Sequence, residues 1–75
     1  MLLREFKIDN NTIILNQDED TYIAQVLGAG GEKLFYHEYK DYEKIKSCFD
    51  EIVQSIQQNT ADIQNIINIL QNSME

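Results

Sequence analysis

The chain has 75 residues, 43% of them apolar, with three phenylalanines, four tyrosines and no proline. A chain of this length holds a single domain with a thin core, because it buries only about 60% of the surface that its unfolded form exposes, and its apolar content excludes a disordered tail. Thirteen acidic residues against six basic ones give a net charge of −7, which disfavours direct binding to nucleic acid or to a membrane surface and favours a protein partner with a basic surface.

The N-terminal segment MLLREFKIDN contains no apolar stretch long enough for a signal peptide or a membrane span, because charged residues begin at Arg4. The chain has one cysteine, Cys48, and therefore forms neither an intramolecular disulfide nor a multi-cysteine zinc site, which is compatible with a reducing compartment. We therefore expect a soluble, cytoplasmic protein.

The first predicted β-hairpin lies at the start of the chain. Apolar and polar residues alternate over residues 2–8, and Asn10 and Asn11 tolerate the positive φ of a two-residue turn before a second β-rich run. This turn places one apolar face towards a core and one polar face towards water. Its apolar cross-strand pairs are Ile8 with Ile13 and Phe6 with Leu15.

The second predicted hairpin follows an acidic loop, NQDED at 16–20, and turns at Gly30 and Gly31. Its cross-strand pairs are Val26 with Phe35, Leu27 with Leu34, and Tyr22 with Tyr39. Apolar residues therefore lie on both faces of this hairpin, and neither face is plainly exposed to water. Together the two hairpins predict an antiparallel sheet of about four strands over residues 1–40.

The segment VLGAGGEKLF, residues 26–35, raises the question of a nucleotide-binding loop, because it holds three glycines and a lysine. A phosphate-binding loop places its glycines between a strand and the N-terminus of a helix, whose amide groups hold the anion. Here a β-rich run follows Lys33 instead, and a Walker loop starting at Gly28 would need glycine at position 33. We interpret the glycines as a hairpin turn and expect no cofactor.

A helical segment is predicted over residues 41–74. Asp41 is suited to cap the helix N-terminus, and Glu43 lies in the first turn, where negative charge is favourable. Apolar residues then recur at the three-and-four spacing of an amphipathic helix: Ile45, Phe49, Ile52, Val53, Ile56, Ile63, Ile66, Ile67 and Leu70. We favour one long continuous helix, because no glycine or proline interrupts it. The alternative is a break near 58–61, where Asn59 or Thr60 would cap a second helix that folds back.

The length of a continuous helix bears on the oligomeric state. Residues 41–72 would form a helix about 48 Å long, whereas strands of six to eight residues span about 20–27 Å. The C-terminal half would then extend beyond the sheet and expose isoleucines that another chain has to cover. A polar asparagine at a heptad core position commonly sets the oligomeric state. We therefore expect a homodimer whose oligomerisation residues are Ile56, Asn59, Ile63, Ile66, Ile67 and Leu70.

Residues suited to catalysis or metal binding are few. His37 and Cys48 are the candidates for a base and a nucleophile, but the sequence shows no orienting group or oxyanion donor beside them. We interpret both as packing residues and expect no enzyme. The acidic run at 18–20 lacks the spacing of an EF-hand, whose sixth position needs glycine where this chain has Ile23, so no metal site is expected.

Tyrosines and carboxylates gather around the second hairpin and the start of the helix. Tyrosine beside carboxylates is typical of a contact surface with an aromatic anchor and an acidic rim, although tyrosines also fill the cores of small sheets. The carboxylates would steer a basic partner towards this surface. The predicted partner-binding residues are Asp18, Glu19, Asp20, Tyr36, Glu38, Tyr39, Asp41, Tyr42 and Glu43.

One stretch of the chain, within residues 22–56, resembles the sheet-then-helix ending of small phage and prophage proteins of low-GC Gram-positive bacteria. The residues that carry the resemblance are Tyr39, Asp41, Glu43, Ile45, Phe49, Glu51, Ile52, Ser55 and Ile56, and residues 57–75 depart from it. Those members that are understood often bind and block host proteins, including defence nucleases. The resemblance therefore implies an anti-defence inhibitor that acts in the cytoplasm of the host cell.

The expected fold class is α+β, with a single domain over residues 1–75 in which an antiparallel sheet at 1–40 precedes a helical segment at 41–74. The expected function is that of a non-catalytic, acidic protein-binding module that blocks a host protein, such as a defence nuclease or an immune effector, by occupying a basic surface. The alternative is an antitoxin-like or repressor-modulating partner that docks through its isoleucine-rich C-terminal helix.

Overall fold

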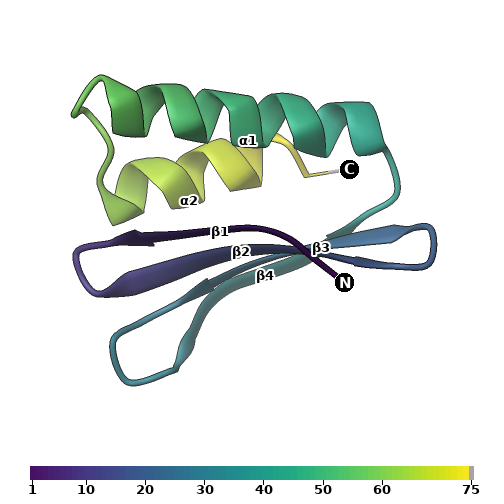
Figure 1. Cartoon of the computed structure of the whole chain (residues 1–75), viewed down its shortest axis with the longest axis horizontal. Coiled ribbons are helices and arrows are strands. Elements are labelled where there is room, and N and C mark those ends of the chain that lie inside the picture. Colours follow the sequence, from purple (N-terminus) through teal and green to yellow (C-terminus); the bar gives the residue numbers. More distant parts are fainter. Residues whose placement is uncertain (75) are drawn as a thin grey trace.

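The computed structural model describes residues 1–74 and has an α+β fold, a four-stranded antiparallel sheet followed by two helices (Figure 1). The elements are β1 (Leu2–Ile8), β2 (Asn11–Asp18), β3 (Thr21–Leu27), β4 (Lys33–Tyr39), α1 (Tyr42–Gln57) and α2 (Ile63–Asn72). The strands pair in chain order as a meander. The predicted fold class is confirmed; position 75, the end of the predicted domain, lies outside the described residues.

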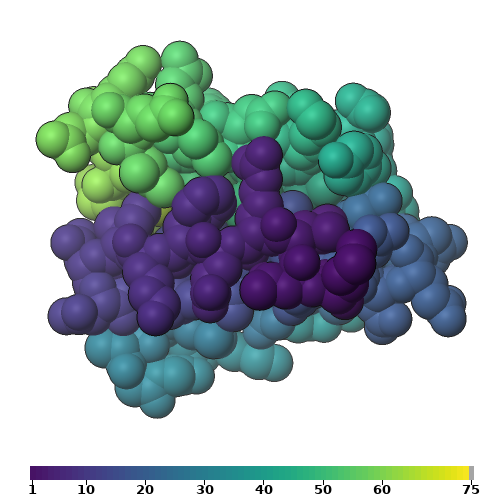
Figure 2. Space-filling view, in the orientation of Figure 1, coloured from purple at the N-terminus to yellow at the C-terminus, as the bar shows by residue number. Residues whose placement is uncertain are grey.

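Both helices lie on one side of the sheet, which we call the covered face, and no described element lies on the other side, which we call the open face (Figure 1). Figure 2 shows the strands and the helices as two layers in contact, with β1 along the front edge. Because side chains alternate between the faces of a strand, neighbouring residues of β2 separate: Ile13 is buried on the covered face and Ile14 lies on the open face.

The first hairpin turns one residue earlier than predicted, at Asp9 and Asn10. Both residues have positive φ, 51° and 67°, which is the conformation of a two-residue type I′ turn. Ile8 therefore pairs with Asn11 and Phe6 with Ile13, so the predicted pairing is wrong by two positions. A shift of two positions keeps every side chain on its predicted face.

The acidic loop predicted at 16–20 is mostly strand. Residues 16–18 belong to β2 and pair with the start of β3, and the chain turns at Glu19 and Asp20, where Glu19 has a φ of 56°. The amide side chain of Gln17 donates a hydrogen bond to the carbonyl oxygen of Glu19 at 2.9 Å. The sheet therefore contains a third hairpin that the sequence analysis did not predict.

The glycine-rich segment forms the last hairpin turn. The predicted pairs of Val26 with Phe35 and of Tyr22 with Tyr39 are confirmed, whereas the register shifts after Val26, so that Leu27 pairs with Lys33 instead of Leu34. The turn is closed by a hydrogen bond from the Gly31 amide to the Gly28 carbonyl at 3.0 Å and by one from the Gly28 amide to the Glu32 carbonyl at 2.8 Å. Gly31 has a φ of 86°, which favours glycine.

The helical segment is broken, so the continuous helix that we favoured is wrong and the alternative break near 58–61 is confirmed. Asn59 has a φ of 61°. The Asn59 amide donates to the Ile56 carbonyl at 3.1 Å, and the Thr60 amide donates to the Ser55 carbonyl at 3.0 Å. This pair of bonds is a Schellman motif with asparagine at the position that glycine usually occupies.

Each helix begins at an aspartate. The Asp41 carboxylate accepts a hydrogen bond from the Lys44 amide at 3.3 Å, which confirms the predicted cap of α1. The carboxylate of Asp62 accepts one from the Asn65 amide at 2.8 Å and caps α2. Asp62, rather than Asn59 or the residue after it, is therefore the cap of the second helix.

The core lies between the covered face and the two helices. Phe6 stacks on Phe49 with ring centroids 6.4 Å apart, and the Tyr39 hydroxyl donates a hydrogen bond to the Leu70 carbonyl at 2.8 Å, which ties β4 to α2. Ile66 and Leu70 of α2 are fully buried. The isoleucine-rich tail is thus covered by its own chain. The buried core comprises Ile13, Leu15, Ala24, Val26, Phe35, Tyr39, Ile45, Cys48, Phe49, Ile52, Ile66 and Leu70.

Candidate functional site

The β2–β3 turn and the start of α1 meet at one end of the molecule, which we call the acidic end. Two contacts join the segments: the Lys40 ammonium donates to the Thr21 hydroxyl at 2.8 Å, and the rings of Tyr22 and Tyr42 lie 5.1 Å apart between centroids. The turn and the helix start lie side by side in Figure 1. The exposed carboxylates of the acidic end are Asp18, Glu19, Asp20, Asp41 and Glu43.

The folding of each segment explains why these carboxylates lie at the surface. Glu19 and Asp20 occupy a tight turn, whose side chains cannot reach a core. Asp41 and Glu43 occupy the N-terminus of α1, where the helix dipole and free amide groups favour negative charge. The acidic end therefore forms because of local structure, without a buried carboxylate.

The four tyrosines differ in exposure. Tyr42 and Tyr36 are 43% and 44% exposed, and Tyr22 is half-buried. Tyr39 has no exposed surface, so its predicted role as a partner-binding residue is wrong, and it belongs to the core instead. Eight of the nine predicted partner-binding residues thus remain exposed. Six of them, the five carboxylates and Tyr42, lie at the acidic end, and the other two, Tyr36 and Glu38, lie on the open face.

Tyr36 and Glu38 form a pair on the open face. The Tyr36 hydroxyl donates a hydrogen bond to the Glu38 carboxylate at 2.9 Å. This hydrogen bond raises the pKa of Tyr36 above its usual value of 10.0, and partial desolvation and the negative charges of Glu38 and Asp18 act in the same direction. The Lys33 ammonium lies over the Tyr36 ring, 4.8 Å from its centroid. Tyr36 is therefore held in place although it is exposed.

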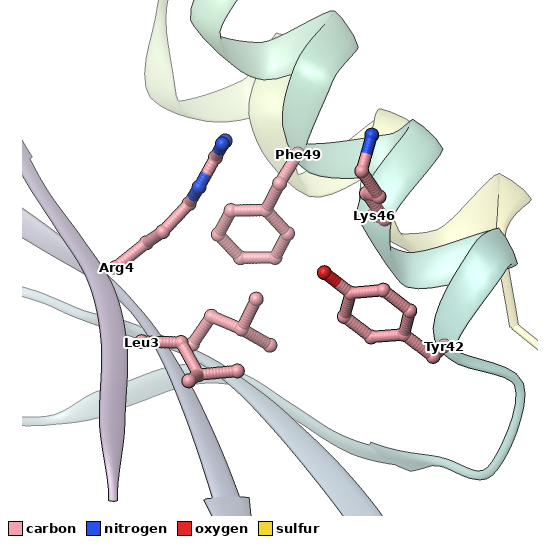
Figure 3. A pocket seen from close by; sticks show the side chains of 6 residues that line it. Leu3, Arg4, Tyr42, Lys46 and Phe49 are labelled. Atoms are coloured by element: carbon pink, nitrogen blue, oxygen red, sulfur yellow. The ribbon is translucent and has the colours of Figure 1, made fainter.

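A cavity of about 210 Å³ opens between the start of β1 and α1, beside Tyr42 (Figure 3). Its lining comprises Leu3, Arg4, Leu15, Tyr42, Lys46 and Phe49. The register of β1 shifts between Leu2 and Arg4, and this bulge allows Leu3 and Arg4 both to line the cavity. The cavity was not predicted, because no residue pattern in the sequence indicates the bulge in β1.

The two cations at the cavity share one carboxylate. The guanidinium of Arg4 lies 3.7 Å from one Asp50 oxygen, and the ammonium of Lys46 lies 3.2 Å from the other. These exposed pairs contribute little to stability, but they place the negative charge of Asp50 between the two cations. The cavity is therefore an apolar depression whose rim keeps one net positive charge, and an apolar side chain fits it better than a basic one.

His37 and Cys48 do not form a reactive pair in this geometry. The His37 ring packs edge-on against Tyr39, with 4.6 Å between centroids. Cys48 is buried, and its thiol lies 3.8 Å from the Ile69 carbonyl oxygen as a weak donor. Burial raises the pKa of the Cys48 thiol above its usual value of 9.0, the charge of Glu51 raises it further, and a hydrogen bond with Ser73 opposes the shift. The reactive thiolate is thus disfavoured; the expectation of no enzyme stays a prediction.

The predicted oligomerisation residues do not form a common exposed surface in the structure. Ile66 and Leu70 are fully buried within the chain, and Ile56, Ile63 and Ile67 are half-buried against the same core. Asn59 is exposed at the break between the helices, where its backbone conformation ends α1. The physical reason for a dimer through these residues therefore no longer holds, although self-association itself stays a prediction.

The open face is the second feature that the sequence analysis did not identify as a surface. The apolar residues Ile14, Ile23 and Leu27 lie on it, half-buried by their neighbours alone. The signal was present in the second predicted hairpin, where apolar residues fall on both faces of the strands. A sheet with helices on one side can cover only one of those faces.

Comparison of the chain with protein-family models, with curated proteins and with solved structures finds no match in any of the three. Over residues 1–74, neither helix is long and apolar enough to cross a membrane.

Proposed function

We propose that this chain is a non-catalytic, acidic protein-binding module, most concretely a phage-type inhibitor that occupies a basic surface of a host protein. The observation that carries the proposal is the acidic end, where two segments of the chain present five exposed carboxylates beside the exposed ring of Tyr42. Nearby cations are fewer: Lys40 bonds to Thr21, Lys44 follows the cap of α1, and the N-terminal ammonium of Met1 donates to the Gln17 carbonyl at 2.7 Å.

The electrostatics of the acidic end favour a basic partner. A surface rich in one sign of charge accelerates the encounter with a surface of opposite sign and rejects partners of like sign. Carboxylates held by backbone structure need no rearrangement to present their charge, which lowers the cost of binding. A partner with clustered lysine or arginine side chains, such as a nuclease surface that binds nucleic acid, has the complementary charge.

The cavity beside Tyr42 provides an anchor for the same partner. Tyrosine is enriched among residues that dominate binding energy, and such residues lie next to pockets that exclude water. An apolar side chain of the partner would enter between Leu3 and Phe49 while its basic neighbours contact the acidic end. Binding of this kind blocks a surface without a chemical step, in the cytoplasm of the host cell.

The regulatory alternative, an antitoxin-like or repressor-modulating partner, requires a different surface. It would dock through the apolar stripe of the C-terminal helix. Ile66 and Leu70 of that stripe are buried against the sheet, and docking through them would require α2 to leave the core. The burial of α2 therefore favours the inhibitor over this alternative.

The experiment is capture of the partner from host cells with a tagged chain, followed by measurement of affinity with the purified partner. The variant Asp20→Lys/Glu43→Lys reverses two charges of the acidic end without changing a helix cap. We expect its affinity to fall by about tenfold or more, mainly through slower association, and to depend less on added salt than the affinity of the unchanged chain. Assay of the captured protein then distinguishes inhibition of a nuclease or immune effector from binding to a toxin or repressor.

The matched control is Glu32→Lys/Glu51→Lys, which makes the same change in net charge at exposed positions outside the acidic end. We expect it to retain most of the affinity of the unchanged chain. Equal loss in both variants would mean that net charge alone drives binding, and no loss in the first would show that the acidic end is not the binding surface. Either result contradicts the proposal.

A further inference from the structure

We propose that the open face of the sheet is an interface between two copies of this chain. In a sheet with helices on one side, the other side is usually polar where it faces water. Here the apolar side chains of Ile14, Ile23 and Leu27 interrupt the polar residues of the two central strands, and Leu34 and Tyr36 lie at the β4 edge, both 44% exposed. Several apolar side chains left partly exposed on one face are typical of a protein interface.

The charge of the open face indicates which partner covers it. The chain carries a net charge of −7, but the acidic residues of this face, Glu5, Asp18 and Glu38, are matched by Lys7, Lys33 and Lys40. A face without net charge gives no advantage to a strongly basic partner. It also allows two acidic chains to approach each other without adding repulsion at the interface.

The arrangement of these charges along the strands is self-complementary. Lys33 pairs with Leu27 at one end of the face, Glu38 pairs with Ile23 towards the other end, and Tyr36 lies in the row between them. A two-fold axis that crosses the strands at this middle row places Glu38 over Lys33 of a second copy and Ile23 over its Leu27.

The same axis places Ile14 over its own copy in the centre of the contact. Glu5 meets its own copy at the exposed β1 edge, where water and salt screen the repulsion. An axis along the strands would instead place Lys33 over Lys7, which is unfavourable. The charges therefore select the axis across the strands, within the small angle that sheet twist introduces between packed sheets.

The size of the face limits how much of it a specific interface has to use. Four strands about 4.8 Å apart and seven residues of about 3.3 Å each give a flat footprint of about 440 Å², which side-chain relief increases. Specific interfaces at the lower end of the range bury about 600 Å² per partner. Nearly the whole open face must therefore take part, and the dissociation constant is expected to be on the order of micromolar.

The test uses the full chain in sedimentation equilibrium from low micromolar to millimolar concentration, with two charge-reversal variants. Lys33→Glu places a carboxylate over Glu38 of the second copy, and Glu38→Lys places an ammonium over Lys33. We expect each variant alone to dissociate about tenfold more readily than the unchanged chain, and an equimolar mixture of the two to form a heterodimer. Restoration in the mixture cannot result from misfolding of either variant.

The matched controls are Lys44→Glu and Glu43→Lys, which make the same charge changes on exposed positions of α1. They should dimerise like the unchanged chain. A chain that stays monomeric at every concentration overturns the proposal, and so does a mixture of the two open-face variants that fails to associate. The open face and the acidic end share Asp18, but Lys33 and Glu38 lie outside the acidic end, and Asp20 and Glu43 lie outside the open face, so either proposal can fail while the other holds.

Discussion

The two faces of the sheet are built from the same strands, and both carry apolar side chains, yet the helices cover only one. On β2, Ile13 is fully buried and Ile14, the next residue, is not. One difference lies in the charged residues: Glu5 and Glu38 occupy the open face, and a helix packed there would have to bury their charges, which is costly even with the hydrogen bond from Tyr36 to Glu38. The covered face is also the more apolar of the two, so apolar content and charge together decide which face becomes the core. Two predictions test this comparison, and a third tests the core between the covered face and α1.

The largest contrast is expected between Ile13→Ala and Ile14→Ala, which remove the same atoms from opposite faces. Ile13 has no exposed surface, and its truncation leaves a cavity that should cost about 2–5 kcal/mol of unfolding free energy. Ile14→Ala should cost less than about 1 kcal/mol, because its side chain is already partly in water. Denaturant unfolding, at concentrations too low for self-association, measures both. Equal losses would show that the open face contributes to the monomer as a core does.

A smaller contrast is expected between Tyr39→Phe and Tyr36→Phe on β4. The Tyr39 hydroxyl makes a buried hydrogen bond to Leu70, and its removal should cost about 1 kcal/mol of unfolding free energy. The Tyr36 hydroxyl bonds to Glu38 in water, so its removal should change stability by less than about 0.5 kcal/mol. Thermal unfolding of the two variants gives the comparison; a larger loss from Tyr36→Phe would contradict it.

The smallest effect is expected from pH, through Cys48 in the core. Its pKa is raised above 9.0 in the folded chain, mainly by burial, so the unfolded chain loses this proton first as pH rises. The thiol therefore contributes stability that is fully present below about pH 9 and is lost as pH rises through the folded pKa. Unfolding of the unchanged chain and of Cys48→Ala between neutral and alkaline pH should show a steeper decline for the unchanged chain. Parallel declines would assign the effect to other groups.

Much of the fold follows from local pattern, but the register of the first hairpin does not. A turn at Asp9–Asn10 and a turn at Asn10–Asn11 give pairings that differ by two positions, so both place Phe6 and Ile8 on the same face. The hydrophobic pattern cannot distinguish them. The backbone chooses the earlier turn, in which the two residues with positive φ are an aspartate and an asparagine.

The break between the helices was only the alternative prediction, for a related reason. The apolar stripe stays in phase from Ile45 to Leu70, so periodicity gives no sign of an interruption. The signal is chemical instead: Asn59 tolerates the left-handed conformation that ends α1, and Asp62 caps the next helix. With α2 folded back, the overhanging stripe that led to a dimer through the helices does not exist.

The candidate site also combines features that the sequence indicates with features that depend on how the chain packs. The exposed carboxylates of the acidic end follow from turns and a helix start, which the sequence indicates directly. Tyr39 could not be separated from Tyr36 and Tyr42 by composition, because only the packing of α2 on β4 buries it. The cavity beside Tyr42 depends on a bulge in β1, which has no sequence signature here.

The meander order of the strands has a consequence for how the chain reaches its native state. Each strand pairs only with its neighbours in the chain, so the sheet can grow hairpin by hairpin, with little entropy lost in closing loops. The docking of α2 is different, since the bond from Tyr39 to Leu70 joins residues 31 positions apart. The docking of α1 also joins distant residues, since Phe6 stacks on Phe49. The sheet should therefore form early, and the docking of the two helices on it should be the later event that completes folding.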